Sequence, residues 1–174
     1  LDAAATLRRR DAATHDWNDS SQVKWLAGAG IDLVRGYARL DGERRVVVTA
    51  ADGTITHLVA RHAVAVCTGS AALLPDIEGL ADAAPWTSRE ATSVKDVPAS
   101  LVVLGGGVVA CEMATAFAAL GSAVTVVARS GLLGNLEPFA GEAVADSLRG
   151  EGVDLRLNVE TNRVTRESDA VVVT

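Results

Sequence analysis

Three small residues lie close together near the middle of the chain, at Gly105, Gly107 and Ala110. They form the pattern G-x-G-x-x-A between an apolar run typical of a buried strand and an alanine-rich run typical of a helix. The first glycine allows a tight turn, the second lets a pyrophosphate approach the backbone, and the alanine lets the helix pack closely on the strand. The N–H groups at the start of such a helix favour phosphate. The pattern therefore predicts a dinucleotide site formed by Gly105, Gly106, Gly107, Val108, Val109 and Ala110.

The residues that follow the next apolar run bear on which dinucleotide is bound. That run, "AVTVVA", ends at Ala128, where an acidic residue would bind the ribose hydroxyls of NAD. Arg129 and Ser130 come directly after it and could hold the 2′-phosphate of NADP. A charge-assisted arginine–phosphate hydrogen bond is worth roughly 1.5–3 kcal/mol, so these residues favour NADP. The alternative is an ordinary solvated arginine at a strand end, and NAD stays possible.

The elements that must position these residues alternate between strands and helices, which predicts an α/β, Rossmann-like domain. The expected strands are residues 100–105, 123–128, 153–158, 162–167 and 170–174, and the expected helices are 108–120 and 141–149.

The first part of the chain has a different pattern. Helix-forming runs cover residues 3–10 and 20–27. Short β-rich runs separated by turn signals then predict an antiparallel meander over residues 31–69 that ends in one buried strand at 62–69. Residues 70–98 hold three prolines and little apolar periodicity, so they predict a connection. We therefore expect one domain at 1–70, a connector at 71–98 and a second domain at 99–174.

Composition narrows the class of protein further. The chain is 49% hydrophobic and 3% aromatic with a net charge of -6, which argues against a nucleic-acid surface. No apolar run reaches membrane-spanning length. Cys67 and Cys111 have no neighbouring ligand at metal spacing, so we expect two buried thiols, no metal site and a reducing cytoplasmic location. The three histidines are scattered and predict no catalytic centre.

Two longer stretches carry a family resemblance. The segments "AVCTGSAALLPDIEGL" and "PWTSREATSVKDVPASLVVLGGGVVACEMATAFAALGSAVTVVARS" resemble the flavoprotein pyridine nucleotide-disulfide oxidoreductases, which include dihydrolipoamide dehydrogenase, glutathione reductase and mercuric reductase. "VTVVARSGLLGNLEPFAGEAV" is most similar to the mercuric reductase branch. The resemblance implies that residues 1–70 are part of an FAD-binding domain and that residues 99–174 are most of an NAD(P)-binding domain.

The resemblance also implies roles for individual residues. Gly36, Tyr37 and Ala38 match a strand beside the FAD adenine, and Thr68 and Gly69 match a turn near the flavin nucleotide.

Three further positions compare differently with the family. Glu112 matches a glutamate that pairs with a lysine near the flavin; its alternative is an ordinary acid near a helix start. Val108 stands where glutathione reductase has a tyrosine over the nicotinamide pocket. Asn135 stands where that enzyme has a second phosphate-binding arginine, which leaves NAD possible.

The resemblance implies a function for a longer protein of which this chain is a fragment. We expect an FAD-dependent oxidoreductase that passes hydride from NAD(P)H to flavin and on to a disulfide or another acceptor, and that forms a homodimer. The redox-active C-x-x-x-x-C pair of the family is absent from these 174 residues. A noncatalytic nucleotide-binding or redox-sensing module, or a flavin oxidoreductase without the disulfide, therefore stays open as an alternative.

Overall fold

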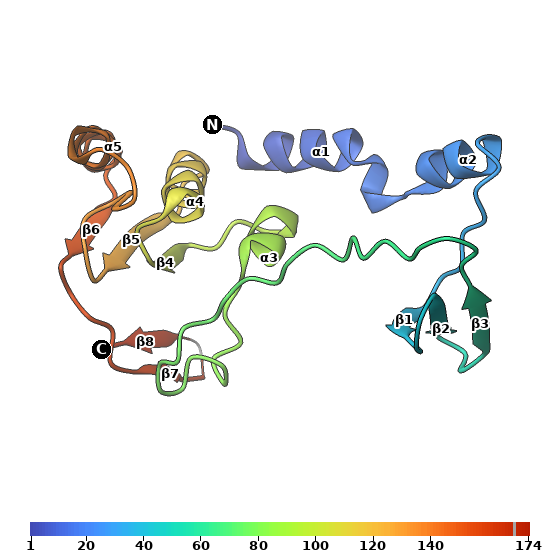
Figure 1. The fold of residues 1–174 in the computed structure, drawn as a ribbon. Helices are drawn as coiled ribbons and strands as arrows, with labels where there is room; N and C mark the ends of the chain where they lie inside the picture. The colour runs from blue at the N-terminus through green and yellow to red at the C-terminus, as the bar shows by residue number, and fades with distance from the viewer. Residues whose placement is uncertain (169) are drawn as a thin grey trace. The chain divides into compact units, whose positions relative to one another are not determined.

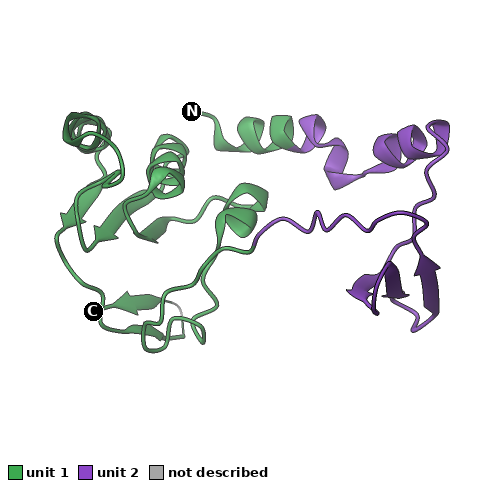
Figure 2. Ribbon diagram, viewed as in Figure 1, with its two compact units in different colours: residues 1–10, 71–174 green, residues 11–70 purple. Residues whose placement is uncertain are grey.

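The computed structural model describes residues 1–168 and 170–174. They divide into two compact units, drawn in different colours in Figure 2. Unit 1 comprises residues 1–10 and 71–174, and unit 2 comprises residues 11–70. The structure thus places residues 71–98 in the same unit as the expected Rossmann-like segment.

A parallel sheet forms the centre of unit 1. Its strands are β4 (Ser100–Leu104), β5 (Ala123–Ala128) and β6 (Asp154–Leu157), in the order β4-β5-β6. Two helices connect them, α4 (Val108–Ala119) and α5 (Pro138–Gly150), and both lie on the same side of the sheet (Figure 1). This strand–helix alternation confirms the expected α/β fold and brings the carboxyl ends of the three strands to one edge.

The core of unit 1 lies between β5 and the two helices. Along β5, Val124, Val126 and Ala128 are buried, while the residues between them point to the other face. Val124 and Val126 pack with Phe117 of α4 and Leu148 of α5 in one apolar cluster. Each fully buried side chain of this size contributes roughly 1.5–3 kcal/mol, so this cluster holds the strand and both helices in place.

Residues 71–98 contain a helix that the sequence did not predict. Helix α3 (Ser88–Ser93) begins with a capping box, in which the Glu90 carboxylate accepts a 2.8 Å hydrogen bond from the backbone N–H of Thr87. Leu80 and Ala83 are buried against Val164 in a second apolar cluster. Strand β7 (Val164–Arg166) pairs antiparallel with β8 (Val171–Val173). Part of the connector is therefore packed into unit 1.

Unit 2 contains the expected meander. Strands β1 (Tyr37–Leu40), β2 (Arg45–Thr49) and β3 (Ile55–Val59) pair antiparallel in chain order. Before them come η1 (His15–Trp17) and α2 (Ser20–Gly28). Helix α1 (Ala3–Ala13) extends three residues beyond the predicted end at Arg10.

Several predictions of local structure were wrong. Residues 62–69 form no strand, because no other described strand lies beside them to pair with their backbone, and Val66 is 64% exposed. Cys67 in this segment is exposed, whereas Cys111 is buried as predicted. The first meander strand begins at Tyr37 and not at Ile31. The helix expected at residues 141–149 forms as α5 and begins three residues earlier, at Pro138, because proline suits the first turn of a helix. Among the described residues, no helix is long and apolar enough to cross a membrane.

Candidate dinucleotide-binding site

Gly105 forms the turn that joins β4 to α4. Its φ of 118° is a conformation that side chains rarely allow, although an added Cβ would meet no atom within 4 Å. Its N–H donates a 2.8 Å hydrogen bond to the carbonyl of Val127 in the neighbouring strand. The backbone conformation itself therefore requires glycine here, as the motif predicts.

Gly107 is the N-cap of α4 and no side chain caps this helix. The N–H of Cys111 donates to the Gly107 carbonyl at 3.1 Å, so the N–H groups before Cys111 have no acceptor within the helix. A Cβ on Gly107 would meet nothing within 4 Å. Val108 and Val109 in the first turn are 55% and 52% exposed. The helix start is therefore an open end that carries partial positive charge.

Gly106 contacts the loop that follows β5, a role that sequence reasoning missed. Its carbonyl accepts a 2.7 Å hydrogen bond from the N–H of Leu133. A Cβ on Gly106 would lie 3.1 Å from the Gly131 carbonyl oxygen and 3.2 Å from the Cβ of Ala128. The only signal in the sequence is that Gly106 occupies a position that G-x-G-x-x-A leaves unrestricted.

The same loop brings Arg129 and Ser130 to the edge of the sheet that holds the glycine turn. Both side chains are exposed. The Ser130 hydroxyl donates to the Gly131 carbonyl at 3.3 Å. Within the described part of the chain, Arg129 has no hydrogen-bond or ion-pair partner in the protein. A guanidinium with all of its donors available lies in the loop that contacts the glycine turn.

Helix α4 also carries Glu112 and Cys111 beside the site. Glu112 is exposed and finds no ion-pair partner among the described residues. The Cys111 thiol is 7% exposed and donates a weak hydrogen bond to the Gly106 carbonyl at 3.9 Å. Burial raises the pKa of the Cys111 thiol, and the nearby Glu112 charge adds to this effect. Cys111 is therefore a packed thiol and not an activated nucleophile.

The residues matched to the FAD site lie in unit 2. Gly36 is explained by the meander itself, because an added Cβ would lie 2.5 Å from the carbonyl oxygen of Thr49. Tyr37 is 68% exposed, and the Arg39 guanidinium lies 5.2 Å from its ring centroid. Ala38, Thr68 and Gly69 are exposed. All five residues are exposed, and their flavin role stays a prediction.

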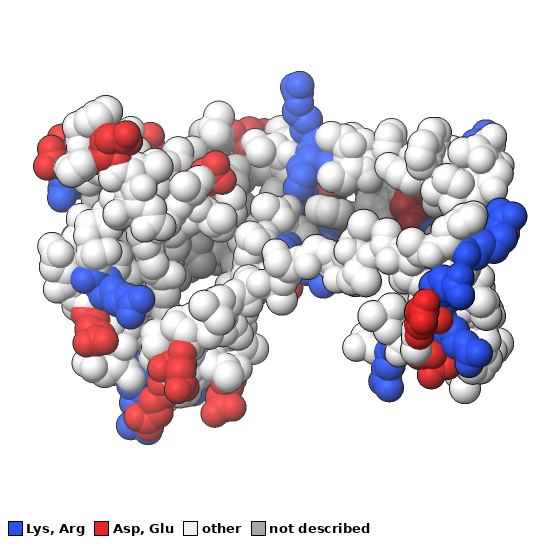
Figure 3. Space-filling view, viewed as in Figure 1, with Lys and Arg blue, Asp and Glu red and all other residues white. Residues whose placement is uncertain are grey.

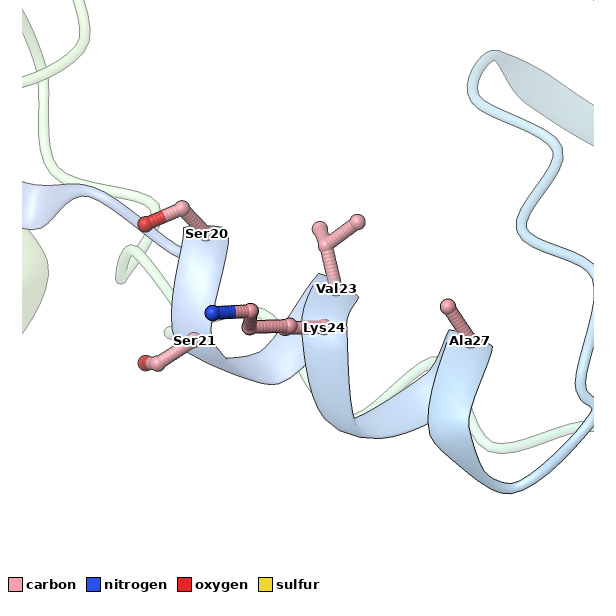
Figure 4. A pocket seen from close by; sticks show the side chains of 5 residues that line it. All are labelled: Ser20, Ser21, Val23, Lys24 and Ala27. Atoms are coloured by element: carbon pink, nitrogen blue, oxygen red, sulfur yellow. The ribbon is translucent and has the colours of Figure 1, made fainter.

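The described surface has other features besides this site. The hollow in Figure 4 is lined by side chains of α2 alone: Ser20, Ser21, Val23, Lys24 and Ala27. Figure 3 shows acidic and basic side chains interspersed on the visible face of each unit. Across residues 1–168 and 170–174, no group of three His, Cys, Asp or Glu side chains could hold a metal ion.

A family model described as pyridine nucleotide-disulphide oxidoreductase matches residues 3–174. The chain belongs to this family. The match covers both the glycine turn and the meander, so the pyridine nucleotide-disulphide oxidoreductase fold accounts for both units.

Individual relatives agree with this assignment. The chain is 37% identical over 165 residues to a mercuric reductase of Shigella flexneri, covering 94% of this chain and 29% of the relative. It is 31% identical over 140 residues to a dihydrolipoyl dehydrogenase of Acholeplasma laidlawii, covering 78% of this chain and 40% of that protein. The chain thus spans well under half the length of these oxidoreductases.

A solved structure supports the fold. The HOCl-induced flavoprotein disulfide reductase RclA from Escherichia coli matches all of this chain over 39% of its own, with a TM-score of 0.81 and 22% sequence identity. At this identity the likeness concerns the fold alone. It agrees with the parallel sheet and the antiparallel meander described above.

Proposed function

We propose that the chain is the nicotinamide dinucleotide-binding part of an FAD-dependent oxidoreductase. The observation that carries the proposal is the open start of α4, where Gly107 leaves space for a pyrophosphate and uncapped N–H groups face it. Val108 and Val109 offer apolar surface beside these groups. In this family the bound cofactors supply the chemistry, which is hydride transfer from the nicotinamide to the flavin, and the protein supplies position and electrostatics.

We further propose that NADP is the preferred nucleotide. The support is that Arg129 directly follows β5, that its side chain is exposed, and that the neighbouring Ser130 carries a hydroxyl. A charge-assisted bond of roughly 1.5–3 kcal/mol corresponds to about a ten- to hundredfold preference over NAD.

The nucleotide proposal is tested by titrating the full-length protein with NADPH and NADH and repeating both titrations with Arg129→Ala. We expect the substitution to weaken NADPH by about ten- to hundredfold and to leave NADH nearly unchanged. Arg149→Ala is the matched control, because Arg149 is also an exposed arginine of unit 1 but lies at the far end of α5 and pairs with Asp146 at 2.9 Å. An unchanged NADPH to NADH ratio in Arg129→Ala would disprove the role of Arg129.

The oxidoreductase proposal has its own test. Anaerobic addition of NADPH to the full-length flavoprotein should bleach the flavin absorbance. Binding of the nucleotide without bleaching would instead favour the noncatalytic alternative.

The acceptor, a disulfide or another oxidant, is part of the same proposal, as are a homodimer and a cytoplasmic location. Support for these comes from the family resemblance and, for location, from the composition. The FAD-binding roles of Gly36, Tyr37, Ala38, Thr68, Gly69 and Glu112 have the same support.

A further inference from the structure

We propose that Gly106 is a positioning residue for nucleotide selection, because it sets where the Arg129 loop lies. The inference rests on the proposed NADP preference. The G-x-G-x-x-A pattern assigns no function to this position, and the φ of Gly106 lies outside the positive range that favours glycine. If a side chain is not tolerated at Gly106, the reason must therefore be steric contact and not backbone conformation.

The constraint is contact with the chain on both sides of Arg129. A Cβ on Gly106 would meet the Cβ of Ala128 at 3.2 Å, directly before Arg129. It would also meet the Gly131 carbonyl oxygen at 3.1 Å and the Leu132 Cδ2 at 3.3 Å, directly after Ser130. Each of these contacts is tighter than ordinary van der Waals contact, so these neighbours must give by a few tenths of an ångström if a side chain is added.

Two hydrogen bonds limit how the loop can move. The Leu133 N–H is held 2.7 Å from the Gly106 carbonyl, so the loop is tied to the residue that would push it. The Gly131 carbonyl that a Cβ would displace also accepts the Ser130 hydroxyl at 3.3 Å. Displacement therefore reaches Ser130 directly and Arg129 through its neighbours.

The three glycines of the turn thus have three different reasons to be glycine. Gly105 needs its backbone conformation, Gly107 leaves open space, and Gly106 makes room for the loop. Only the last of these acts on the segment that would distinguish NADPH from NADH.

The test measures dissociation constants for NADPH and NADH with the full-length protein and its Gly106→Ala and Gly106→Val variants. We expect the preference for NADPH to fall in order of side-chain size, by about threefold to tenfold in Gly106→Val, with NADH binding changed less. Gly134→Ala and Gly134→Val are matched controls, since Gly134 lies in the same loop and a Cβ there would meet only the Ser130 Oγ, at 3.9 Å. Circular dichroism melting confirms that each variant is folded.

A double-variant cycle separates the two proposals. If Gly106 acts through the position of Arg129 and Ser130, then Gly106→Val has a smaller effect on the ratio in an Arg129→Ala background than in the parent protein. If Arg129→Ala lowers the ratio but Gly106→Val does not, or does so equally in both backgrounds, the role of Gly106 is disproved and the NADP proposal stands. If Arg129→Ala leaves the ratio unchanged, the NADP proposal fails and the inference fails with it.

Discussion

The backbone N–H of Leu133 donates a 2.7 Å hydrogen bond to the carbonyl oxygen of Gly106. This bond joins two segments that are separate in the sequence, the turn before α4 and the loop after β5. Leu133 adopts a φ of 52°, which is uncommon for a leucine and is held by the surrounding structure. This hydrogen bond therefore links the turn proposed to bind the pyrophosphate to the loop proposed to bind the 2′-phosphate.

Gly107→Ala is expected to weaken NADPH and NADH binding by a similar factor. The added methyl meets nothing in the protein but occupies the space proposed for the pyrophosphate. The φ of −79° suits alanine, so we expect a loss of no more than about 1 kcal/mol in the free energy of unfolding, the usual scale for a changed N-cap. Titration with both nucleotides and urea denaturation measure the two effects. Unchanged binding of both nucleotides would contradict the proposed site.

Phe117→Ala is expected to destabilise unit 1 by about 3–5 kcal/mol, because it leaves a cavity in the core. Phe117 is 2% exposed, and its ring centroid lies 6.2 Å from that of Trp86. Phe139→Ala removes the same side chain from a position that is 72% exposed, and we expect a change within about 0.5 kcal/mol. Chemical denaturation of the two variants compares them. Equal losses would mean that the cluster around Phe117 is not the core.

Cys111 is expected to make stability fall at alkaline pH. Its thiol pKa is raised in the folded state, mainly by burial, so the unfolded chain loses this proton first as the pH increases. The unfolded state then binds fewer protons than the folded state, and the free energy of unfolding decreases as the pH rises. Denaturation between about pH 8 and about pH 10, around the ordinary thiol pKa, measures the slope. Cys111→Ala should show a shallower slope; an identical slope would assign the effect to other groups.

Local patterns predicted most of the strands and helices of unit 1 correctly. The reason is that these elements pair and pack with other elements of the same unit. Strand β5 forms at the predicted residues 123–128, and α4 begins where Gly107 ends the turn. The same reasoning failed at residues 62–69, where an apolar run has no described strand beside it. An apolar run shows that a segment can be buried, but hydrogen bonding to a neighbouring strand decides whether it becomes a strand. Helix α3 was missed because a six-residue helix has too few turns for a periodic pattern.

The sequence by itself determined the family and the position of the glycine turn, and it predicted Arg129 as the residue that would contact a 2′-phosphate. These depend on residue types at fixed spacings along the chain. Only the tertiary structure decided that Gly106 contacts Ala128, Gly131 and Leu132, and that Leu133 bonds to its carbonyl. Contacts of this kind depend on how closely two segments approach once β4 and β5 pair, and spacing along the chain does not record that distance.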